Sequence, residues 1–320
     1  MGGSTKQALL QALSAAEGAY ISGQQLAEAL GVSRAAVHKA AQALSAQGYA
    51  LDSAPRRGYR LAGGDPFCAE AVGLYPAPIH IYDTLQSSNL TAKQLALGGA
   101  PHGTLVLTAH QKAGRGRLGR RFESPAGKGV YLSLILRPAL SAADAQSVTI
   151  SAAVAVARAV KALCGLELGI KWVNDLYYQG RKVCGILTEA GTDMECGQLE
   201  WLVVGIGLNL TTSSADWPEE LARTAGSLYP GGPAPVSRAV LAGAIARELL
   251  SLCPAFDCLD EYRARCFVPG HWVTVCTGVD TYAAKALSID DAGRLVVERE
   301  GGRQVALQHG EVSIRPTRTG

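Results

Sequence analysis

Apolar side chains recur at helical spacing in three short segments near the start of the chain. The helices predicted from this spacing cover residues 6–17, 24–30 and 34–47. Ser22 and Ser33 stand where the caps of the second and third helices belong, because a serine oxygen there accepts a hydrogen bond from a free backbone amide. Two short alternating segments, residues 49–51 and 58–61, predict a β-ribbon after the helices. The pattern is that of a helix-turn-helix followed by a wing.

The middle of the chain alternates between strand-like and helix-like patterns, which predicts an α+β domain around one mixed sheet. The predicted strands cover residues 103–108, 130–136, 168–171, 183–188 and 199–205. The predicted helices cover residues 90–97, 142–163 and 236–253. From residue 269 on we expect only short strands, joined by Gly and Asp turns into a small closing β-barrel. These strands cover residues 271–277, 281–289, 294–299, 303–306 and 310–314.

Length and composition fit a cytosolic protein of two or three domains. The chain has 320 residues, and the stretch Gly63-Gly-Asp-Pro66 reads as a linker, so we expect domains at 1–63, 64–268 and 269–320. No run of 18 apolar residues occurs, and the start of the chain lacks the apolar core of a signal peptide, so we expect no membrane association. Eight cysteines form no Cys-x-x-Cys pair, which favours reduced thiols and no metal site.

The predicted helix-turn-helix has the charge expected of a DNA-binding unit. Residues 1–62 contain six basic and three acidic side chains, a net charge of +3 that equals the net charge of the whole chain. In this motif the second helix enters the major groove and the wing contacts phosphates. The candidate DNA-binding residues are Arg34, His38, Lys39 and Gln42 on that helix and Arg56 and Arg57 at the wing tip. The alternative is a helical module that binds protein.

Three arginines alternate with three glycines in the segment Gly-Arg-Gly-Arg-Leu-Gly-Arg at residues 114–120. The spacing matches the dinucleotide-binding fingerprint, but no helix follows, and no Gly-Lys-Ser/Thr follows that would make a P-loop. Guanidinium groups bind phosphate and carboxylate oxygens in pairs, and glycines let a loop open and close. This pattern favours a loop that binds a phosphate-bearing substrate. The alternatives are a solvated basic turn and a second nucleic-acid contact.

Residues 171–175, Lys-Trp-Val-Asn-Asp, and residues 181–189, Arg-Lys-Val-Cys-Gly-Ile-Leu-Thr-Glu, flank a short turn at Gln179-Gly180. A hairpin through this turn would bring Asp175 close to Lys182, beside the arginine-rich loop. The alternative is an ordinary hairpin with a surface ion pair.

With these motifs in order along the chain, the sequence resembles the bifunctional biotin–protein ligases that are also biotin operon repressors. The resemblance rests on Gly-Arg-Gly-Arg-x-Gly-Arg at 114–120, Lys-Trp-x-Asn-Asp at 171–175 and Lys-x-x-Gly-Ile-Leu-x-Glu at 182–189. Ser87-Ser88-Asn89, Gln111, Val204-Gly-Ile-Gly-Leu-Asn209 and Gly310-Glu-Val-Ser-Ile-Arg315 support it. It covers essentially the whole chain. It implies a catalytic domain like that of class II aminoacyl-tRNA synthetases and an SH3-like C-terminal barrel.

The resemblance also implies a two-step reaction and a role for each matching residue. Biotin and ATP would give biotinyl-5′-AMP with the help of Mg²⁺, and a lysine of a biotin carboxyl carrier domain would then accept the biotinyl group. The implied catalytic residues are Lys182, Arg117 and Asp175. The implied biotin-binding residues are Ser87, Ser88, Asn89, Gln111, Gly114, Arg115, Gly116, Lys182 and Gly185. The implied ATP- and adenylate-binding residues are Arg115, Arg117, Arg120, Phe122, Asn174, Lys182 and Asn209. Operator DNA and an adenylate-bound homodimer are the further implied partners.

Several positions depart from the family pattern. Val173 stands where the family has proline, Ser88 where it has threonine, and Leu118 and Phe122 where Arg and Trp are frequent. Cys184 stands between Lys182 and Gly185, where we expect its thiol to be close enough for alkylation to inhibit the site. Other readings are a ligase whose winged helix no longer regulates, a lipoate or octanoate ligase, and a regulator that only binds its ligand.

Overall fold

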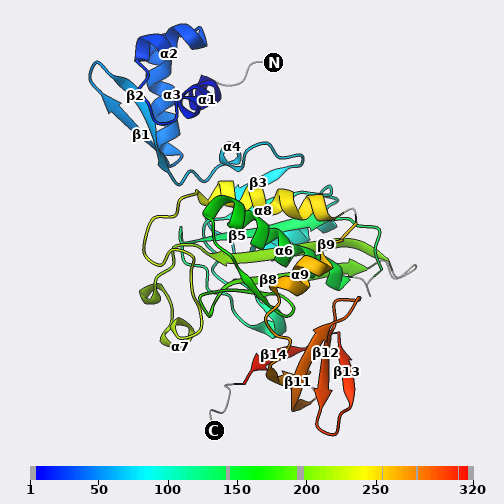
Figure 1. Cartoon of the computed structure of the whole chain (residues 1–320). Helices are drawn as coiled ribbons and strands as arrows, with labels where there is room; N and C mark the ends of the chain where they lie inside the picture. The colour runs from blue at the N-terminus through cyan, green and yellow to red at the C-terminus, as the bar shows by residue number, and fades with distance from the viewer. Residues whose placement is uncertain are drawn as a thin grey trace. The chain divides into compact units, whose positions relative to one another are not determined.

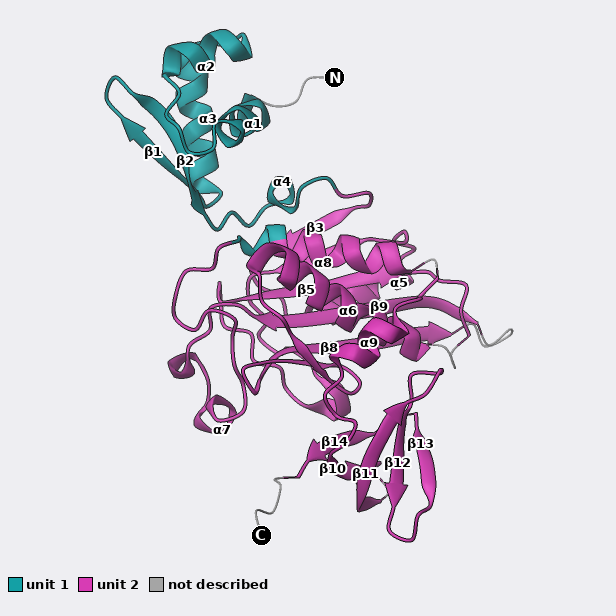
Figure 2. Ribbon diagram, in the orientation of Figure 1, with its two compact units in different colours: residues 1–74, 236–240 teal, residues 75–235, 241–320 magenta. Residues whose placement is uncertain are grey.

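Residues 5–141, 145–192, 198–253, 255–278, 280–308 and 310–315 are described in a computed structural model of the chain. Two units can be separated, as Figure 2 shows in two colours. Unit 1 contains Met1–Leu74 with Val236–Val240, and unit 2 contains Tyr75–Pro235 with Leu241–Gly320. The predicted division into three domains stays a prediction.

Unit 1 contains the predicted three helices and wing. Its elements are α1 (Thr5–Ala15), α2 (Gly23–Leu30), α3 (Arg34–Ala46), β1 (Tyr49–Ala54), β2 (Gly58–Gly64) and α4 (Ala69–Val72). Both predicted caps are formed: Ser22 Oγ accepts from Gln25 N at 3.2 Å and Ser33 Oγ accepts from Ala36 N at 3.1 Å. The helices bury their leucines against one another, so Leu9, Leu13, Leu26 and Leu44 are at most 1% exposed. The apolar spacing therefore identified the true packing faces.

The wing is longer than predicted, because β2 continues through the two glycines that the sequence analysis took for a linker. Gly64 pairs with Tyr49 and Gly63 with Ala50. A Cβ on Gly64 would lie 2.3 Å from the carbonyl oxygen of Gly48, so no larger residue fits this approach. These glycines serve close strand pairing rather than flexibility, which sequence composition alone does not reveal.

Unit 2 is built on one mixed sheet of seven strands in the order β3-β4-β5-β9-β8-β7-β6 (Figure 1). The strands are β3 (Ile79–Tyr82), β4 (Leu105–Thr108), β5 (Gly129–Leu136), β6 (Gly169–Lys171), β7 (Asp175–Tyr178), β8 (Arg181–Thr192) and β9 (Leu199–Asn209). Only β3 and β4 pair in parallel, and the other ladders are antiparallel. The predicted mixed sheet is confirmed, although the sequence analysis missed the four-residue strands β3 and β7.

Helices α5 (Ser88–Leu97), α6 (Ala145–Cys164) and α9 (Leu259–Arg265) pack on strands of this sheet. The chain also contains α7 (Glu219–Ala222), α8 (Arg238–Leu252) and the 3₁₀ turns η1 (Arg117–Gly119) and η3 (Ser214–Asp216). Part of the predicted helix 142–163, residues 142–144, lies outside the described residues. Within the described part of the chain, α6 alone is long and apolar enough to span a membrane, and 61% of its apolar window is buried inside the protein. That burial is typical of a core helix.

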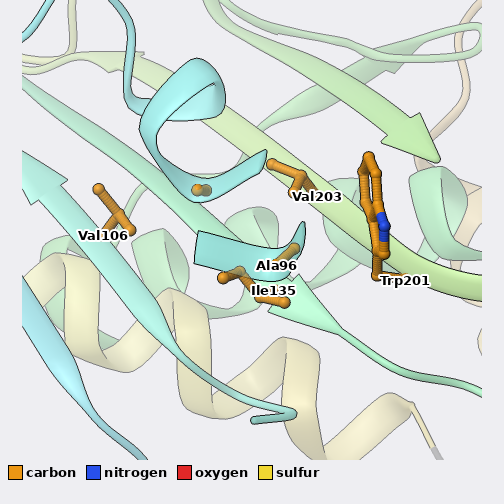
Figure 3. Packing of buried hydrophobic residues seen from close by; sticks show 6 residues of the cluster. Ala96, Val106, Ile135, Trp201 and Val203 are labelled. Carbon is orange, nitrogen blue, oxygen red and sulfur yellow. The ribbon is translucent and has the colours of Figure 1, made fainter. Parts of the chain in front are cut away.

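The small helix α5 packs on β4, β5 and β9 through a compact apolar cluster (Figure 3). The cluster consists of Ala92, Ala96, Val106, Ile135, Trp201 and Val203, and all are at most 3% exposed. Since side chains alternate along β5, Ser133 shares the α5-facing side of the strand with Ile135. The cluster therefore fixes α5 against the side of the sheet on which the polar residues of the site lie.

A second, antiparallel sheet follows at the C-terminal end of unit 2. Its strands are β10 (Trp272–Cys276), β11 (Thr281–Ile289), β12 (Leu295–Arg299), β13 (Gln304–Leu307) and β14 (Glu311–Ile314), in the order β13-β12-β11-β10-β14. The five predicted strands are confirmed to within two residues. Among the described residues β13 and β14 are edge strands that do not pair with each other, so the ladder does not close into the barrel that the sequence analysis expected.

Candidate active site

A cavity of about 420 Å³ opens beside β7, β8 and β9 of unit 2. Its lining contains every predicted catalytic, biotin-binding and adenylate-binding residue except Gly114. The side of Gly114 is closed, because its carbonyl accepts a hydrogen bond from Phe122 N and a Cβ there would lie 2.3 Å from the carbonyl oxygen of Phe122. Gly114 thus shapes the loop rather than the cavity surface. Residues far apart in sequence converge as the motifs predicted.

One end of the cavity is a buried network of polar side chains, here called the polar network: Ser88, Asn89, Gln111, Ser124 and Ser133. Gln111 Oε1 accepts from Ser88 N at 2.8 Å, and Gln111 Nε2 donates to Ser124 Oγ at 2.8 Å. Ser133 Oγ lies 2.8 Å from Ser88 Oγ and 2.6 Å from Asn89 Oδ1. All five residues are at most 8% exposed. Such a network presents fixed donors and acceptors to a polar ring such as a ureido group.

Asn89 ties this network to two strands. Its amide nitrogen donates to Glu189 Oε2 at 3.0 Å and to the carbonyl of Leu187 at 3.2 Å, both on β8. On β9, a Cβ at Gly205 would lie 2.0 Å from Asn89 Oδ1. Asn89 therefore fills the space that the missing side chain of Gly205 leaves, and we interpret it as a residue that fixes the network.

A second part of the cavity lining comes from the Gly-Arg loop, residues 114–120, whose first glycine borders Gln111 and Ser124 of the polar network. Arg117 donates to Asn174 Oδ1 at 2.8 Å and to the carbonyl of Gly310 at 3.1 Å. Arg120 forms an ion pair of 2.6 Å with Glu311, although its side chain is 69% exposed. The loop tip, Leu118, is 72% exposed at a φ of 54°. The partners of the loop therefore come from the hairpin and from the edge of the C-terminal sheet.

A third part of the lining comes from the predicted hairpin of β7 and β8. Lys182 Nζ lies 2.6 Å from Asp175 Oδ1, a distance of an ion pair, without the geometry of a hydrogen bond. Asn174 donates to the carbonyl of Ile186 at 2.9 Å and accepts from Ile186 N at 2.9 Å, which keeps the segment seated although Val173 replaces proline. Burial lowers the pKa of Lys171, the strand partner of Asp175. The predicted approach of Asp175 to Lys182 is confirmed.

The floor of the cavity consists of glycine backbone and one aromatic ring. A Cβ at Gly207 would lie 2.5 Å from the ring of Phe122, and one at Gly185 would lie 3.6 Å from it. The ring makes an edge contact with Tyr131, with centroids 6.4 Å apart. Nearby, Asn209 Oδ1 is buried without a hydrogen-bond partner in the described part of the chain, while its Nδ2 donates to the carbonyl of Gly226. An unpaired buried acceptor at this place is typical of a ligand contact.

Cys184 lies close to the site, as expected, since it is among the residues that line the cavity. Its side chain is buried, and burial raises the pKa of the thiol above its ordinary value. Inhibition by alkylation stays a prediction.

The sequence analysis did not assign several residues in and around the cavity. Ser124 and Ser133 hydrogen-bond other members of the polar network from outside the cavity lining. Gly310 and Glu311 contact the loop, and Trp217 lines the cavity from the segment after β9. A lone serine in an apolar strand gives no sequence signal. Only the similarity of residues 310–315 to a family motif pointed towards the C-terminal sheet.

Unit 1 presents its own candidate surface, a groove of about 710 Å³ between α2, α3 and the wing. Of the predicted DNA-binding residues, Arg34, His38 and Arg56 line the groove, whereas Lys39, Gln42 and Arg57 are exposed outside it. Arg57 stacks over the ring of Tyr20, 4.1 Å from its centroid. The His38 Nδ1 atom on α3 lies 3.0 Å from the hydroxyl of Tyr59 on β2, so the wing contacts a side chain of α3.

Known proteins match the chain in both units. The HTH domain family matches residues 5–60, and the Biotin/lipoate A/B protein ligase family matches residues 82–209. The "Bifunctional ligase/repressor BirA" of Bacillus subtilis is 34% identical over 313 residues, which cover 92% of this chain and 94% of that protein. The "Biotin--[acetyl-CoA-carboxylase] ligase" of Mycobacterium tuberculosis is 32% identical over 237 residues, 71% of this chain and 85% of that protein.

Solved structures agree on the fold. A biotin protein ligase from Aquifex aeolicus, solved in complex with biotin and ATP, superposes with a TM-score of 0.61 at 24% identity. The match covers 75% of this chain and 99% of that chain.

Proposed function

We propose that this chain, which belongs to the family of bifunctional biotin ligase/repressor proteins, activates biotin with ATP and transfers the biotinyl group to a lysine of a carrier domain. The observation that carries the proposal is one cavity with three complementary parts. The polar network suits a ureido ring, the Lys182–Asp175 pair suits a carboxylate and its acceptor amine, and the Gly-Arg loop suits phosphates.

In the first step, a carboxylate oxygen of biotin attacks the α-phosphorus of ATP. A new oxygen–phosphorus bond forms, the bond to the β-phosphate oxygen breaks, and pyrophosphate leaves with the electron pair. Negative charge builds on the α-phosphate oxygens, and we assign Lys182 to stabilise it, because a fixed cation in a water-poor site needs no reorganisation. Arg115, Arg117 and Arg120 would hold the phosphates, which requires Arg117 and Arg120 to exchange their partners Asn174 and Glu311 for the ligand.

In the second step, the neutral amine of the acceptor lysine attacks the acyl carbon of the adenylate. The carbon–nitrogen bond forms, the bond from the acyl carbon to the phosphate oxygen breaks, and AMP leaves. The amine must lose a proton, and Asp175 is our candidate to orient it and take that proton. Phe122, Asn174 and Asn209 would contact the nucleotide.

Mg²⁺ would enter with the triphosphate, and Asn209 Oδ1 is a buried oxygen in the cavity lining, without a hydrogen-bond partner among the described residues, that would suit a hard cation. When bound, the ion would neutralise phosphate charge. Among the described residues there is no group of three or more His, Cys, Asp or Glu side chains that could hold a metal by themselves.

The test is biotin-dependent exchange of labelled pyrophosphate into ATP. We expect exchange with biotin, none with lipoate or octanoate, and a loss of at least a hundredfold in Lys182→Ala, since about 3 kcal/mol of transition-state stabilisation depends on one fixed cation. Lys112→Ala is the matched control, because Lys112 is an exposed lysine outside the cavity. Exchange with a fatty acid in place of biotin would make the protein a lipoate or octanoate ligase, and exchange unchanged in Lys182→Ala would refute the assigned role.

Unit 1 supports a second activity, binding of operator DNA. We assign base contacts to Arg34, His38, Lys39 and Gln42 and phosphate contacts to Arg56 and Arg57. A gel shift on the promoter region of the chain's own gene, with and without biotin plus ATP, is the test. A ligand-dependent shift supports a repressor, and no shift supports a ligase whose winged helix only stabilises it.

Finer features follow from the family and stay proposals. We propose a homodimer when the adenylate is bound, which would present two winged units to a two-fold DNA site. We also propose a cytoplasmic location, an acetyl-CoA carboxylase subunit or another biotin-dependent carboxylase as the carrier, a class II synthetase-like sheet and an SH3-like C-terminal domain. The division at 1–63, 64–268 and 269–320 belongs with them.

A further inference from the structure

We propose that Gly293, in the turn between β11 and β12 of the C-terminal sheet, and Trp172 form a positioning pair for the ligase reaction. The carbonyl of Gly293 would fix the indole of Trp172, and through it the Asn174-Asp175 end of the hairpin. The proposal rests on the proposed function of the same site and adds Gly293, which is not among the residues that line the cavity, and Trp172, which lines the cavity and is assigned no part in the chemistry.

The contact itself is buried and specific. Trp172 Nε1 donates to the carbonyl of Gly293 at 3.0 Å, and Gln146 Nε2 on α6 donates to the same oxygen at 2.6 Å. Trp172 is 3% exposed, so its indole N–H has no access to bulk water in place of this partner. Two elements of the catalytic region therefore share one acceptor on the C-terminal sheet.

The turn that supplies this acceptor has little freedom. Asp290 Oδ1 accepts from Ala292 N at 3.0 Å and from Arg294 N at 2.9 Å, and Gly293 N donates to the carbonyl of Asp290 at 2.9 Å. Gly293 has a φ of 75°, and a Cβ there would lie 2.2 Å from Ile150 Cδ1. The positive φ favours glycine, and the short distance shows that the turn lies close against Ile150 on α6.

A second tie holds the same turn from α9. Arg263 Nε donates to the carbonyl of Ile289 at 3.0 Å, and its Nη2 lies 2.6 Å from Asp291 Oδ1. The same side chain pairs with Asp260 on its own helix. The turn is thus attached to the catalytic region at both of its ends.

Trp172 is followed directly in sequence by the residues that contact the catalytic side chains. The next carbonyl, that of Val173, accepts from the hydroxyl of the fully buried Tyr262 at 3.1 Å. Asn174 then holds Arg117, and Asp175 pairs with Lys182. Freeing Trp172 would loosen the hairpin end that sets the distance from Lys182 to Asp175.

The biotin end of the cavity does not depend on this path. Its polar network comes from α5, β5 and the segment around Gln111 and Ser124, and within the described residues none of the hydrogen bonds of this network involves Trp172 or Gly293. Loss of the pair should therefore lower kcat and leave the KM for biotin unchanged. A merely structural contact would lower stability and leave both parameters alone.

The experiment compares Trp172→Phe with Gln146→Ala in the full-length protein. Each removes one donor from the same carbonyl, but only Trp172 leads to Asn174 and Asp175. Biotin-dependent pyrophosphate exchange and transfer to a biotin carboxyl carrier domain are measured together with the melting temperature. We expect kcat to fall about tenfold in Trp172→Phe with the KM for biotin unchanged within twofold, because small displacements of a catalytic group cost rate steeply. In Gln146→Ala we expect kcat within twofold of wild type.

Equal kcat values in the two variants, whether lowered or not, overturn the proposal. If Trp172→Phe does not fold, Arg263→Gln decides, since it loosens the turn from a partly exposed position and should lower kcat about twofold to threefold; an unchanged kcat overturns the proposal. Absence of exchange in the wild type is a different failure, because it refutes the proposed function and the positioning role together.

Discussion

The polar network and the Gly-Arg loop are built in opposite ways. The polar network is buried, and its five side chains hydrogen-bond one another at fixed positions on α5, β5 and the segment from Gln111 to Ser124. The Gly-Arg loop is half-exposed, and its arginines pair with groups outside the loop, Asn174 and the Gly310–Glu311 edge. The polar network is complete before any ligand arrives. In the Gly-Arg loop, the arginine side chains pair with protein groups that a phosphate can replace.

This difference has an energetic side. A buried hydrogen-bonding group that loses its partner costs about 1–3 kcal/mol, whereas an exposed ion pair such as Arg120–Glu311 is worth about 0–1 kcal/mol. Changes at the polar network should therefore affect stability and biotin binding together. Changes at the loop should affect the lifetime of the phosphate-bearing ligand and leave stability alone.

The sharpest test is a pair of glycines on β9. Gly205→Ala places a Cβ against Asn89 Oδ1, which Ser133 and Glu189 hold in place, so we expect a loss of about 3 kcal/mol in the free energy of unfolding and a strongly raised KM for biotin. Gly207→Ala meets the Phe122 ring, which has only an edge contact to restrain it. Because Phe122 lines the cavity and is partly exposed, its ring has space to move there, so we expect a loss of less than about 1 kcal/mol and a raised KM for ATP only.

Urea unfolding and steady-state kinetics on both variants measure this. The two substitutions make the same change to the backbone, since both glycines lie on β9, two residues apart. Equal destabilisation by the two alanines would therefore contradict the difference that we infer between the polar network and the Gly-Arg loop.

A second change breaks the polar network without adding volume. Gln111→Leu removes the acceptor of Ser88 N and the donor to Ser124 Oγ, so we expect the KM for biotin to rise about 10- to 100-fold, the equivalent of about 1–3 kcal/mol. The KM for ATP should stay near the wild-type value. A matching rise in both constants would show that the polar network and the Gly-Arg loop are not separate.

A third change acts on the loop. Arg117→Ala removes the guanidinium that we assign to the phosphate of the adenylate, and we expect the intermediate to leave the site about tenfold faster, with the melting temperature unchanged. Release of labelled biotinyl-adenylate from the enzyme, followed by rapid filtration, gives the rate. Retention as long as in the wild type would remove Arg117 from the binding set.

The smallest expected effect concerns pH. Burial lowers the pKa of Lys171 below its ordinary value of 10.5, so the folded state carries the cost of a buried charge at neutral pH. As the pH rises through the folded pKa towards 10.5, the unfolded chain holds more protons than the folded one, and stability recovers. Lys171→Met should therefore raise the melting temperature by about 2 °C at pH 7. That gain should shrink towards pH 10.5, and a constant gain would contradict the assignment.

Short stretches of sequence were enough to predict much of the fold and of the candidate site. Ser22 and Ser33 cap helices as predicted, because capping depends on neighbours three residues away. The turn at Gln179-Gly180 joins two strands as predicted and pairs Tyr177 with Lys182. Asp175 lies two residues before Tyr177, beyond a register shift, and its side chain reaches Lys182. These features need only short stretches of sequence to form.

What could not be predicted depends on distant pairing. Ser133 lies in a fully buried strand, and it belongs to the site only because it hydrogen-bonds Asn89 on another element. Glu311 is 191 residues from Arg120 in sequence, and no local pattern joins them. Closure of the C-terminal sheet into a barrel is not confirmed, because β13 and β14 do not pair among the described residues, and no local sequence pattern shows whether two edge strands pair. At Gly64 a local signal was misleading. Glycine is typical of linkers, but here it lies in a strand whose close pairing requires it.

The contact of Arg117 with the carbonyl of Gly310 has a consequence for the order of synthesis. The two residues are 193 positions apart, so a ribosome that adds about 5–20 residues per second needs roughly 10 to 40 s to make the second after the first. Helices α1, α2 and α3 and the wing lie within the first 64 residues and can fold during that time. A nascent chain therefore contains these three helices and the wing well before its Gly-Arg loop can meet Gly310.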